Sequence, residues 1–418
     1  MRGAARCICK PMSEFEIIRL GHQGDGIAAG PVFAALTLPG EIVSGTLEGT
    51  RLNDVRIVTP SEGRVRPPCR HFKSCGGCQL QHAKDDFVAS WKVDVVRHAL
   101  AAQGLDAEFR SVITSPERSR RRASFSVRRT KKAALAGFHG RASGAIVEIP
   151  DCHLLQKELL GAVEIAKSLA MLAGSRKGEM SVTATTSNAG LDIAVSGGKP
   201  LDGSLRMALG QEAERFGLAR LSWDSELAAQ REPPTQTFGR AQVVPPFGAF
   251  LQATHEGEAA LLVCISEIVG DAADVIDLFS GCGTFSIPLA ENAQVHAVEG
   301  DADMVAAMDA GWRRAQGLKR LTHEARDLFR RPLQPDELKK FGAVVLDPPR
   351  AGAEAQVAEL AKSGIGKIAY VSCNPVSFAR DIKTLHDAGY EVDWVQVVDQ
   401  FRWSSHVELV ARLTLKSA

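Results

Sequence analysis

A short apolar segment that runs directly into charged and turn-forming residues reads Val344-Val345-Leu346-Asp347-Pro348-Pro349-Arg350, and a second reads Ile368-Ala369-Tyr370-Val371-Ser372-Cys373-Asn374-Pro375. Apolar runs of this length, flanked by Gly or Pro, are typical of strands that are buried on both faces. Open parallel sheets bind ligands at the carboxyl ends of their strands, so we expect Asp347 and Cys373 to face one crevice. A thiol beside a carboxylate in such a crevice indicates covalent catalysis, with Cys373 as the nucleophile.

The sequence after Phe250 alternates strand-like and helix-like segments. Further strands are predicted at residues 274–279 and 295–299, ahead of the two segments quoted above. This alternation is the pattern of a doubly wound α/β domain. We therefore expect a Rossmann-like α/β domain over residues 251–418.

A glycine-containing loop follows the first of these strands and reads Asp277-Leu278-Phe279-Ser280-Gly281-Cys282-Gly283-Thr284-Phe285-Ser286. The glycines permit a tight turn and a close approach of a ligand to the backbone. Glu299 ends the next strand, where an acidic group would hold ribose hydroxyls. This geometry serves both NAD and S-adenosylmethionine, but dinucleotide enzymes usually have a third glycine where this chain has Ser286. Together with Asp327 in a later loop, the pattern resembles the class I methyltransferases that bind S-adenosylmethionine.

Bulk properties limit the class of protein. The chain has 418 residues, so two or three domains are expected. Lys plus Arg number 50 and Asp plus Glu number 49, which gives a net charge of +1, so any nucleic acid must be met by a local patch. Apolar stretches are too short to span a bilayer, and the N-terminus lacks the apolar core of a secretion signal. We expect a cytoplasmic enzyme.

The N-terminal part has a different character. Residues 1–12 are expected to form a flexible tail, and residues 13–62 alternate apolar and polar groups between glycine-rich turns, which predicts a small OB-like β-barrel. Such barrels are common surfaces for oligonucleotides. Residues 63–250 read as an α+β middle domain, although a helix near residues 84–103 could pack on a neighbouring domain instead.

The nine cysteines are odd in number, which argues against a framework of disulfides. Cys69, Cys75 and Cys78 form a C-x5-C-x2-C cluster, with Cys152 downstream. Four thiolates can close a tetrahedral zinc site or hold an iron–sulfur cluster, and the ligand count alone does not decide between the two. The C-x3-C-x2-C spacing that is usual for radical S-adenosylmethionine enzymes is absent.

Eight cations lie between residues 118 and 132 without an acidic residue among them. They are Arg118, Arg120, Arg121, Arg122, Arg128, Arg129, Lys131 and Lys132. A charge run is usually a solvated face, but on a protein that is otherwise neutral this one favours contact with a phosphate backbone. Such contacts position a nucleic acid without reading its sequence.

Four motifs in order resemble one family. They are C-x5-C-G-G-C at residues 69–78, D-P-P-R at 347–350, S-C-N-P at 372–375, and His406-Val407-Glu408. In this combination the chain resembles the RNA uracil-5-methyltransferases, and specifically the branch that modifies 23S ribosomal RNA. The resemblance implies a barrel-like TRAM domain and a 4Fe-4S cluster held by Cys69, Cys75, Cys78 and Cys152.

The resemblance also implies a mechanism. C5 of uracil is a poor nucleophile, so the Cys373 thiolate would first add to C6, and Glu408 would later remove the C5 proton. The target base must be flipped out or already unpaired. The positions that match cofactor contacts of the family are Gln252, Phe279, Thr284, Glu299, Asp327 and Asp347. Asp347 could also accept the N3 proton of the base. Thr254 and Thr284 stand where the family often has Asn.

Other functions remain open at this point. The same chemistry on transfer RNA is the nearest alternative, although members that act there commonly lack the barrel and the cluster. An RNA cytosine-5-methyltransferase would typically show a P-C-S context around its nucleophile. A catalytically silent RNA-binding or assembly protein is opposed by the intact Cys373 and Glu408. No membrane contact and no obligate protein partner is expected.

Overall fold

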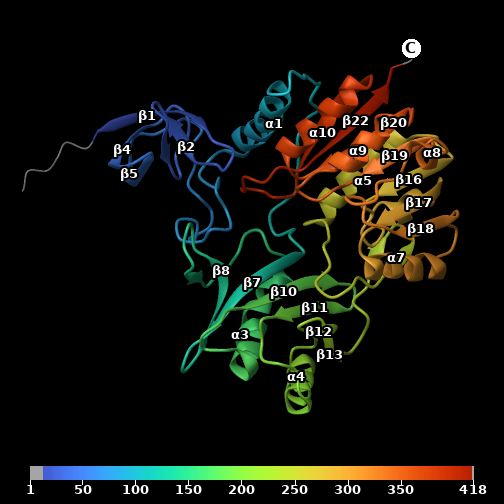
Figure 1. The fold of residues 1–418 in the computed structure, drawn as a ribbon. Coiled ribbons are helices and arrows are strands. Elements are labelled where there is room, and N and C mark those ends of the chain that lie inside the picture. Colours follow the sequence, from blue (N-terminus) through green and yellow to red (C-terminus); the bar gives the residue numbers. More distant parts are fainter. Residues whose placement is uncertain (1–12, 417–418) are drawn as a thin grey trace, which may run out of the picture. The chain divides into compact units, whose positions relative to one another are not determined.

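The computed structural model describes residues 13–416 and separates into two compact units (Figure 1). The first unit comprises the chain up to Phe72, together with Cys78–Val88 and Trp403–Ser405. The second comprises Lys73–Gly77, Ala89–Arg402 and the chain from His406 onward. The tail expected at residues 1–12 lies outside the described residues.

The first unit contains a closed five-stranded barrel, with strand order β1-β2-β3-β5-β4. The strands are β1 (Glu14–Leu20), β2 (Gly26–Ala28), β3 (Val32–Ala34), β4 (Ile42–Glu48) and β5 (Arg51–Thr59). Its small core includes the buried side chains of Ile17, Val43 and Leu52. The barrel predicted for this part of the sequence is therefore confirmed.

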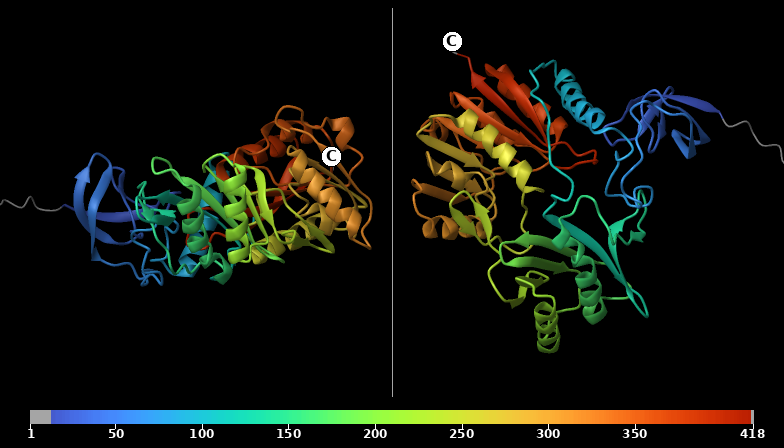
Figure 2. Two further views of the ribbon diagram at one scale, coloured as in Figure 1. Left: turned by 90° about the horizontal axis from the view of Figure 1, so that it is seen from below. Right: turned by 180° about the vertical axis from the view of Figure 1, so that it is seen from behind.

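The second unit contains two large sheets and a two-stranded one, and the first large sheet has seven strands in the order β13-β12-β11-β10-β7-β8-β9. The strands are β7 (Arg122–Arg129), β8 (Ala134–His139), β9 (Ile146–Val147), β10 (Met180–Ser187), β11 (Gly190–Ser196), β12 (Arg220–Trp223) and β13 (Glu226–Gln230). Apolar residues of β7 and β10 share a core with helices that pack against this sheet. Figure 2 shows the ribbon of these elements from two further sides. These helices are α2 (Lys157–Leu160), α3 (Ala162–Ala173) and α4 (Gly203–Arg215).

The second sheet has eight strands in the order β18-β17-β16-β19-β20-β22-β21-β6. The strands are β6 (Ile113–Thr114), β16 (Asp274–Leu278), β17 (Gln294–Glu299), β18 (Leu321–Ala325), β19 (Ala343–Leu346), β20 (Lys367–Ser372), β21 (Tyr390–Asp399) and β22 (Leu409–Leu415). The first five in this order run parallel, and β22 lies antiparallel to both of its neighbours. The chain turns from one side of β16 to the other, which confirms the doubly wound α/β arrangement.

Helices cover both faces of this sheet (Figure 1). One core contains residues of α9 (Glu354–Leu360) and α10 (Pro375–Asp387). The other contains residues of α5 (His255–Val269), α6 (Ser286–Leu289) and α7 (Ala302–Arg314). Strands β16, β19 and β20 contribute side chains to both cores, which explains why their sequences are almost continuously apolar. The remaining elements are α8 (Pro335–Leu338) and the hairpin of β14 (Gln236–Phe238) with β15 (Ala241–Val243).

The packing of helix α1 (Asp85–Ala101), which the sequence left open, is visible in the structure. The helix falls within the stretch that the sequence assigned to a middle domain. Its residues Val96 and Leu100 are fully buried in the same core as α9 and α10, and β6 pairs with β21. The segment around residues 89–114 therefore belongs to the α/β sheet, because its apolar side chains fill a face that would otherwise be exposed.

The basic segment at residues 118–132 is only partly exposed. Arg121 has the same parity as the buried Phe125 of β7, so its side chain points inward and is 0% exposed. Its guanidinium forms an ion pair with Glu258 and donates to the carbonyl of Gln252 at 2.9 Å. Arg122 donates to the carbonyl of Gly248 at 3.0 Å. The expectation that all eight cations meet phosphate is therefore wrong for Arg121, whereas Arg118, Arg128, Lys131 and Lys132 are exposed.

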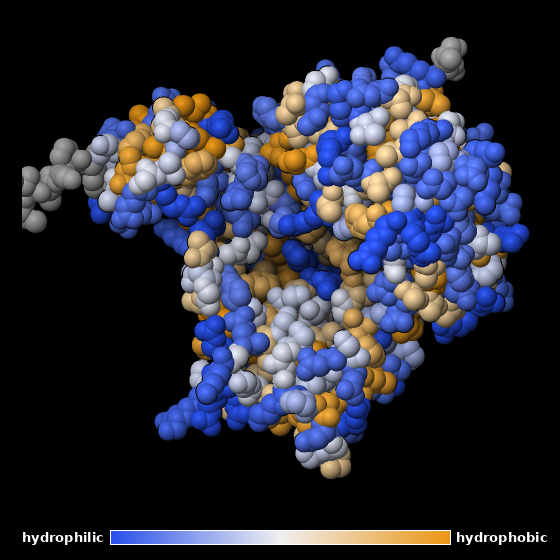
Figure 3. Space-filling view, in the orientation of Figure 1, coloured by the Kyte–Doolittle hydropathy of each residue, from blue (hydrophilic) through white to orange (hydrophobic). Residues whose placement is uncertain are grey.

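The face shown in Figure 3 is largely hydrophilic, with apolar residues in small groups, as on ordinary protein surfaces. Among the described residues, no helix is both long enough and apolar enough to cross a membrane.

Candidate active site

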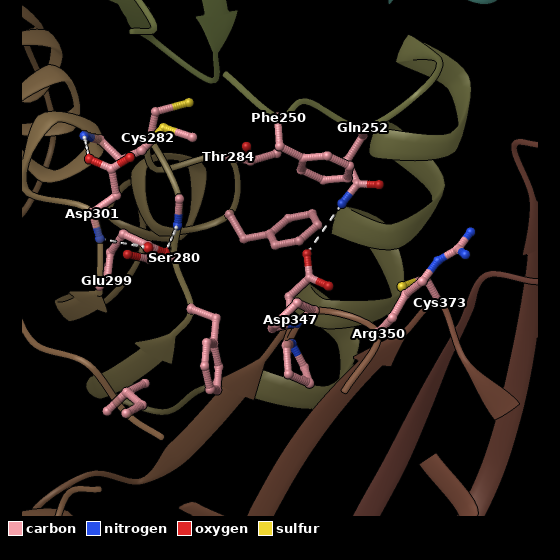
Figure 4. Close-up of a pocket in the computed structure, with 18 of the residues that line it drawn as sticks. Phe250, Gln252, Ser280, Cys282, Thr284, Glu299, Asp301, Asp347, Arg350 and Cys373 are labelled. Atoms are coloured by element: carbon pink, nitrogen blue, oxygen red, sulfur yellow. Dashed lines mark hydrogen bonds between the residues drawn. The ribbon is translucent and has the colours of Figure 1, made fainter. Parts of the chain in front are cut away.

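A cavity of about 500 Å³ lies at the carboxyl ends of the parallel strands in the second unit. The residues that the sequence assigned to catalysis and cofactor binding all line it: Gln252, Phe279, Thr284, Glu299, Asp327, Asp347, Cys373 and Glu408. Figure 4 shows Gln252, Asp347, Arg350 and Cys373 toward one end and Glu299, Asp301 and Ser280 toward the other. The structure thus gathers side chains that are up to 156 residues apart in the chain, from Gln252 to Glu408.

The sheet topology explains this convergence. Phe279 follows β16, Glu299 ends β17, Asp347 follows β19 and Cys373 follows β20. These strands are parallel and adjacent, so their carboxyl ends share one edge. The crevice opens between β16 and β19, where the order of strands reverses.

The loop after β16 makes a tight turn that requires glycine. Gly281 and Gly283 have φ values of +56° and +90°, and a Cβ at Gly283 would lie 2.7 Å from Cγ of Met308. Phe279 has a φ of +62°, which is uncommon for a residue with a side chain and is often retained at binding sites. The Glu299 carboxylate accepts from the N–H groups of Gly281 and Asp301, each at 3.0 Å, and so joins the two loops.

Ser286 occupies the position at which dinucleotide-binding proteins have a third glycine. Its hydroxyl donates to the carboxyl of Asp277, a fully buried residue at the end of β16. The hydroxyl thus ties the loop to the strand. This contact accounts for a serine where the sequence comparison with dinucleotide enzymes expected none.

Two aromatic residues of the cavity were not predicted. Phe250 lines the cavity although its side chain is 65% exposed, and Phe329 packs against Phe279 with ring centroids 5.5 Å apart. Their rings supply flat apolar walls that suit an adenine or a nucleobase. The sequence signals that could have indicated these two residues are their positions. Phe250 lies two residues before Gln252, and Phe329 lies two residues after Asp327.

The acidic groups of the cavity strongly influence one another. Burial raises the pKa of the Cys373 thiol to about 11, and the charges of Glu408 and Asp347 add to the shift. Burial, together with the neighbouring Asp347, also raises the pKa of Glu408 well above its usual range. Burial and the charge of Glu299 raise the pKa of Asp347 to about 7. Burial in the cavity therefore favours the protonated forms of these groups, and a bound cation would favour their charged forms.

Arg350 opposes these shifts. Among the described residues that line the cavity, it is the only Arg or Lys. Its backbone carbonyl accepts from Nδ2 of Asn374 at 2.8 Å and from Oγ of Ser377 at 3.1 Å, and its Nη2 lies 2.8 Å from Nδ1 of His406. Its positive charge lowers the pKa values of both Cys373 and Glu408. Residues next to Cys373 thus hold Arg350 in place, and its charge favours the thiolate of Cys373.

The four cysteines predicted to bind a metal are divided between the two units. Cys69 and Cys78 belong to the first unit, and Cys75 and Cys152 to the second. Within residues 13–416, no group of three or more His, Cys, Asp or Glu residues is placed so that it could hold a metal ion. The four-cysteine site therefore stays a prediction.

Comparison with known proteins agrees with this site. Residues 246–416 match the family model described as tRNA (Uracil-5-)-methyltransferase. A protein of Rhizobium meliloti named an uncharacterized RNA methyltransferase is 44% identical, covering 95% of this chain and 98% of that protein. A Marinomonas protein named 23S rRNA (uracil(1939)-C(5))-methyltransferase RlmD is 31% identical, covering 97% of this chain and 96% of that protein.

A solved structure extends the likeness to the fold. The tRNA (uracil-54, C5)-methyltransferase of Pyrococcus abyssi, in complex with S-adenosyl-L-homocysteine, aligns with a TM-score of 0.74 at 24% identity and covers 96% of this chain and 99% of that chain. The fold and the cavity define a methyltransferase of the α/β class. The chain belongs to the RNA uracil-5-methyltransferase family and is an RNA methyltransferase.

Proposed function

We propose that the protein transfers a methyl group from S-adenosylmethionine to C5 of a uridine in RNA, through a covalent adduct between Cys373 and C6, and that the substrate is 23S ribosomal RNA. The main support for this reaction is that Cys373, Glu408 and Asp347 line the same cavity as the glycine loop. A thiol nucleophile, a second carboxyl group and a nucleotide-type loop are the parts that this reaction needs.

S-adenosylmethionine would bind where Glu299 and the glycine loop meet. The carboxylate of Glu299 is positioned to accept from ribose hydroxyls, and Phe279 and Phe329 offer an apolar wall for the adenine. Thr284 and Asp327 line the same region, and Asp347 lies between it and Cys373. The cofactor supplies an electrophilic methyl group on a positively charged sulfur.

Replacing Glu299 with alanine should weaken cofactor binding by roughly 10- to 100-fold, because two charge-assisted hydrogen bonds to ribose are lost. The backbone of Gly281 would lose its carboxylate partner as well. Titration calorimetry with S-adenosylhomocysteine measures the effect. Glu324→Ala is the matched control, since Glu324 is a carboxylate of the neighbouring strand β18. Equal affinities for the Glu299 variant and the wild type would contradict this assignment.

The order of bond changes follows from uracil chemistry. The Cys373 thiolate adds to C6, and the ring electrons move toward O4, so that C5 can attack the methyl group while S-adenosylhomocysteine leaves. Glu408 then takes the proton from C5, the electron pair re-forms the C5–C6 double bond, and the C6–S bond breaks to return the thiolate. Asp347 is proposed to accept the N3 proton and so orient the base.

The electrostatics of the cavity suit this sequence when the cofactor is bound. Burial raises the pKa of Cys373 to about 11, which favours the thiol over the thiolate. A positive sulfonium near Asp347 and the guanidinium of Arg350 both favour the thiolate. The bound methyl donor and Arg350 would therefore act together to favour the reactive form of the nucleophile.

The choice of 23S ribosomal RNA rests on three observations. A relative that shares 31% identity over nearly the whole chain is named for that substrate. The N-terminal barrel is a type of domain that commonly binds oligonucleotides. The exposed cations Arg118, Arg128, Lys131 and Lys132 can contact phosphates. Transfer RNA is the second candidate, since the matching family model is named for it.

Mapping of 5-methyluridine in RNA from a deletion strain tests the substrate. We expect one or more uridines of 23S ribosomal RNA to lose the methyl group, and the purified protein to restore it in vitro. Loss in transfer RNA alone would overturn the ribosomal assignment but keep the reaction. Unchanged 5-methyluridine in both RNAs, with no activity of the purified protein on either, would overturn the proposed reaction.

We also propose that Cys69, Cys75, Cys78 and Cys152 hold a 4Fe-4S cluster that stabilises the fold. Within the second unit, the N–H of Gly77 points to Sγ of Cys75 at 3.4 Å, and the backbone of Gly76 binds His139. A Cβ at Gly76 would lie 2.9 Å from the carbonyl oxygen of His139, so this turn requires glycine. Such N–H···S contacts are common around cluster thiolates. Iron and acid-labile sulfide in the anaerobically purified protein would support the cluster, and stoichiometric zinc without sulfide would overturn it.

A further inference from the structure

Gln400 is a buried residue that directly follows β21 and that no sequence motif indicated. Gln400 is only 3% exposed, and its side chain contacts the side chains of Gln252 and Glu408. Buried amide groups need partners for both ends, so the contacts of this side chain determine its orientation.

Both ends of the Gln400 amide are engaged. Its Oε1 accepts from the N–H of Ala253 at 2.8 Å, and its Nε2 donates to Oε1 of Gln252 at 2.6 Å. The same side chain is hydrogen bonded to the carboxyl group of Glu408. Because a backbone N–H holds Oε1, the amide cannot be reversed without losing all of these contacts.

The orientation of the Gln400 amide also fixes the orientation of the Gln252 amide. Since Oε1 of Gln252 accepts from Gln400, Nε2 of Gln252 must face away from it, and it donates to Oδ2 of Asp347 at 3.2 Å (Figure 4). A connected set of hydrogen bonds therefore joins Glu408 to Asp347 through Gln400 and Gln252. The carboxyl groups of Glu408 and Asp347 each accept a hydrogen bond from a glutamine amide.

The surroundings of Gln400 are built to hold it in place. Gly257, near the start of α5, has no side chain where a Cβ would lie 2.7 Å from Cβ of Gln400. The preceding residue, Asp399, forms an ion pair with Lys92 at 2.6 Å, and both of these side chains are almost fully buried. Lys92 also donates to the carbonyl of Phe401 at 3.1 Å. The backbone on both sides of Gln400 is thus anchored to α1.

We propose that Gln400 is a positioning residue of the methyl-transfer reaction, whose amide holds Glu408 ready to accept the C5 proton and fixes the donor face of Gln252 toward Asp347. This inference rests on the proposed function. The fixed amide of Gln252 would present a hydrogen donor beside the carboxylate of Asp347, a pairing that matches the O4 and N3–H edge of uracil. Cytosine offers the opposite pattern at these two positions, so the same arrangement disfavours it.

The protonation of Glu408 gives this role a measurable signature. The charged groups that face Glu408 are Asp347, which follows β19, Arg350, in the loop beyond it, and the Cys373 thiol, which follows β20. Burial and Asp347 raise the pKa of Glu408, whereas the hydrogen bond from Gln400 and the charge of Arg350 lower it. Removing the amide donor therefore leaves Glu408 protonated up to a higher pH, and the base is available only above that pH.

The Gln400→Met variant tests the inference, because methionine keeps the length of the side chain without its hydrogen bonds. We expect the acid limb of the kcat–pH profile to move upward by about one pH unit, with roughly a tenfold loss of kcat on that limb. Activity should recover at alkaline pH, and the KM for S-adenosylmethionine should stay within about twofold of the wild type. Methylated covalent adduct should accumulate on the acid side, and methylation of cytidine in place of the target uridine should become detectable.

Gln396→Met is the matched control, since Gln396 is a buried glutamine of β21, the strand that Gln400 follows, and its amide donates to the carbonyl of Ser111 instead. Its pH profile should match that of the wild type. If Gln400→Met does not fold, Gln400→Asn is judged by the same profile, because its shortened amide cannot span the same partners. A variant that folds and either keeps the wild-type profile or loses activity equally at every pH would overturn the inference. A wild-type protein that methylates no uridine would overturn the proposed function, and this inference with it.

Discussion

Replacing Cys373 with alanine should reduce RNA methylation by roughly 10⁴-fold or more, because the reaction has no other way to activate C5 of the base. Cys373 follows β20 in the cavity wall, beside Asp347, Arg350 and Glu408. An alanine there removes the sulfur and leaves the cofactor loop and the basic surface unchanged. The affinity for RNA and for S-adenosylhomocysteine should therefore stay near the wild-type values.

RNA that carries 5-fluorouridine at the target position separates the covalent step from binding. Fluorine at C5 cannot be removed as a proton, so the wild-type protein should remain attached to this RNA through Cys373 after methyl transfer. The complex should survive denaturing electrophoresis, and mass spectrometry should place the link on the peptide that contains Cys373. The Cys373→Ala variant should form none of it.

Cys282 provides a matched control because it is a second cysteine that lines the same cavity. Its side chain is 1% exposed, and burial raises the pKa of its thiol to about 12. Cys282→Ala should therefore keep the adduct, with a modest loss of stability at most. An adduct that persists in Cys373→Ala, or one that depends on Cys282, would contradict the assignment of the nucleophile.

The sequence predicted which residues share the cavity because several of them lie at strand ends. Asp347 and Cys373 each follow an apolar run that is buried on both faces, and such runs are readable without a structure. Parallel strands then bring their carboxyl ends together, so local patterns far apart in the chain predict one crevice.

The same reasoning does not reach side chains whose role depends on tertiary contacts. Arg121 looked like one of many surface cations, yet its parity with Phe125 points it into a buried ion pair with Glu258. Gln400 follows a strand that has no motif of its own, and its importance depends on a residue 148 positions away, Gln252. The neighbours of helix α1 were left open for a related reason, since a helical pattern shows an apolar face but not which core that face enters.

Release of the methylated RNA should depend on Glu408. Glu408→Gln should allow Cys373 to add and the methyl group to transfer, but it should slow removal of the C5 proton by roughly 10²- to 10⁴-fold. Glutamine fills the same space, yet its amide cannot accept a proton at neutral pH. Methylated RNA should consequently accumulate as a covalent complex on natural uridine, where the wild type leaves none.

A single-turnover experiment with a labelled methyl donor measures this directly. The label should appear in the protein–RNA complex at close to one methyl group per active site, and free methylated RNA should follow slowly. The double variant Cys373→Ala/Glu408→Gln should form no complex, which shows that the accumulated species depends on the thiol. Burst formation of free product by Glu408→Gln at the wild-type rate would mean that another group removes the proton, and Asp347, a carboxyl group of the same cavity whose pKa burial raises to about 7, would then be the next candidate.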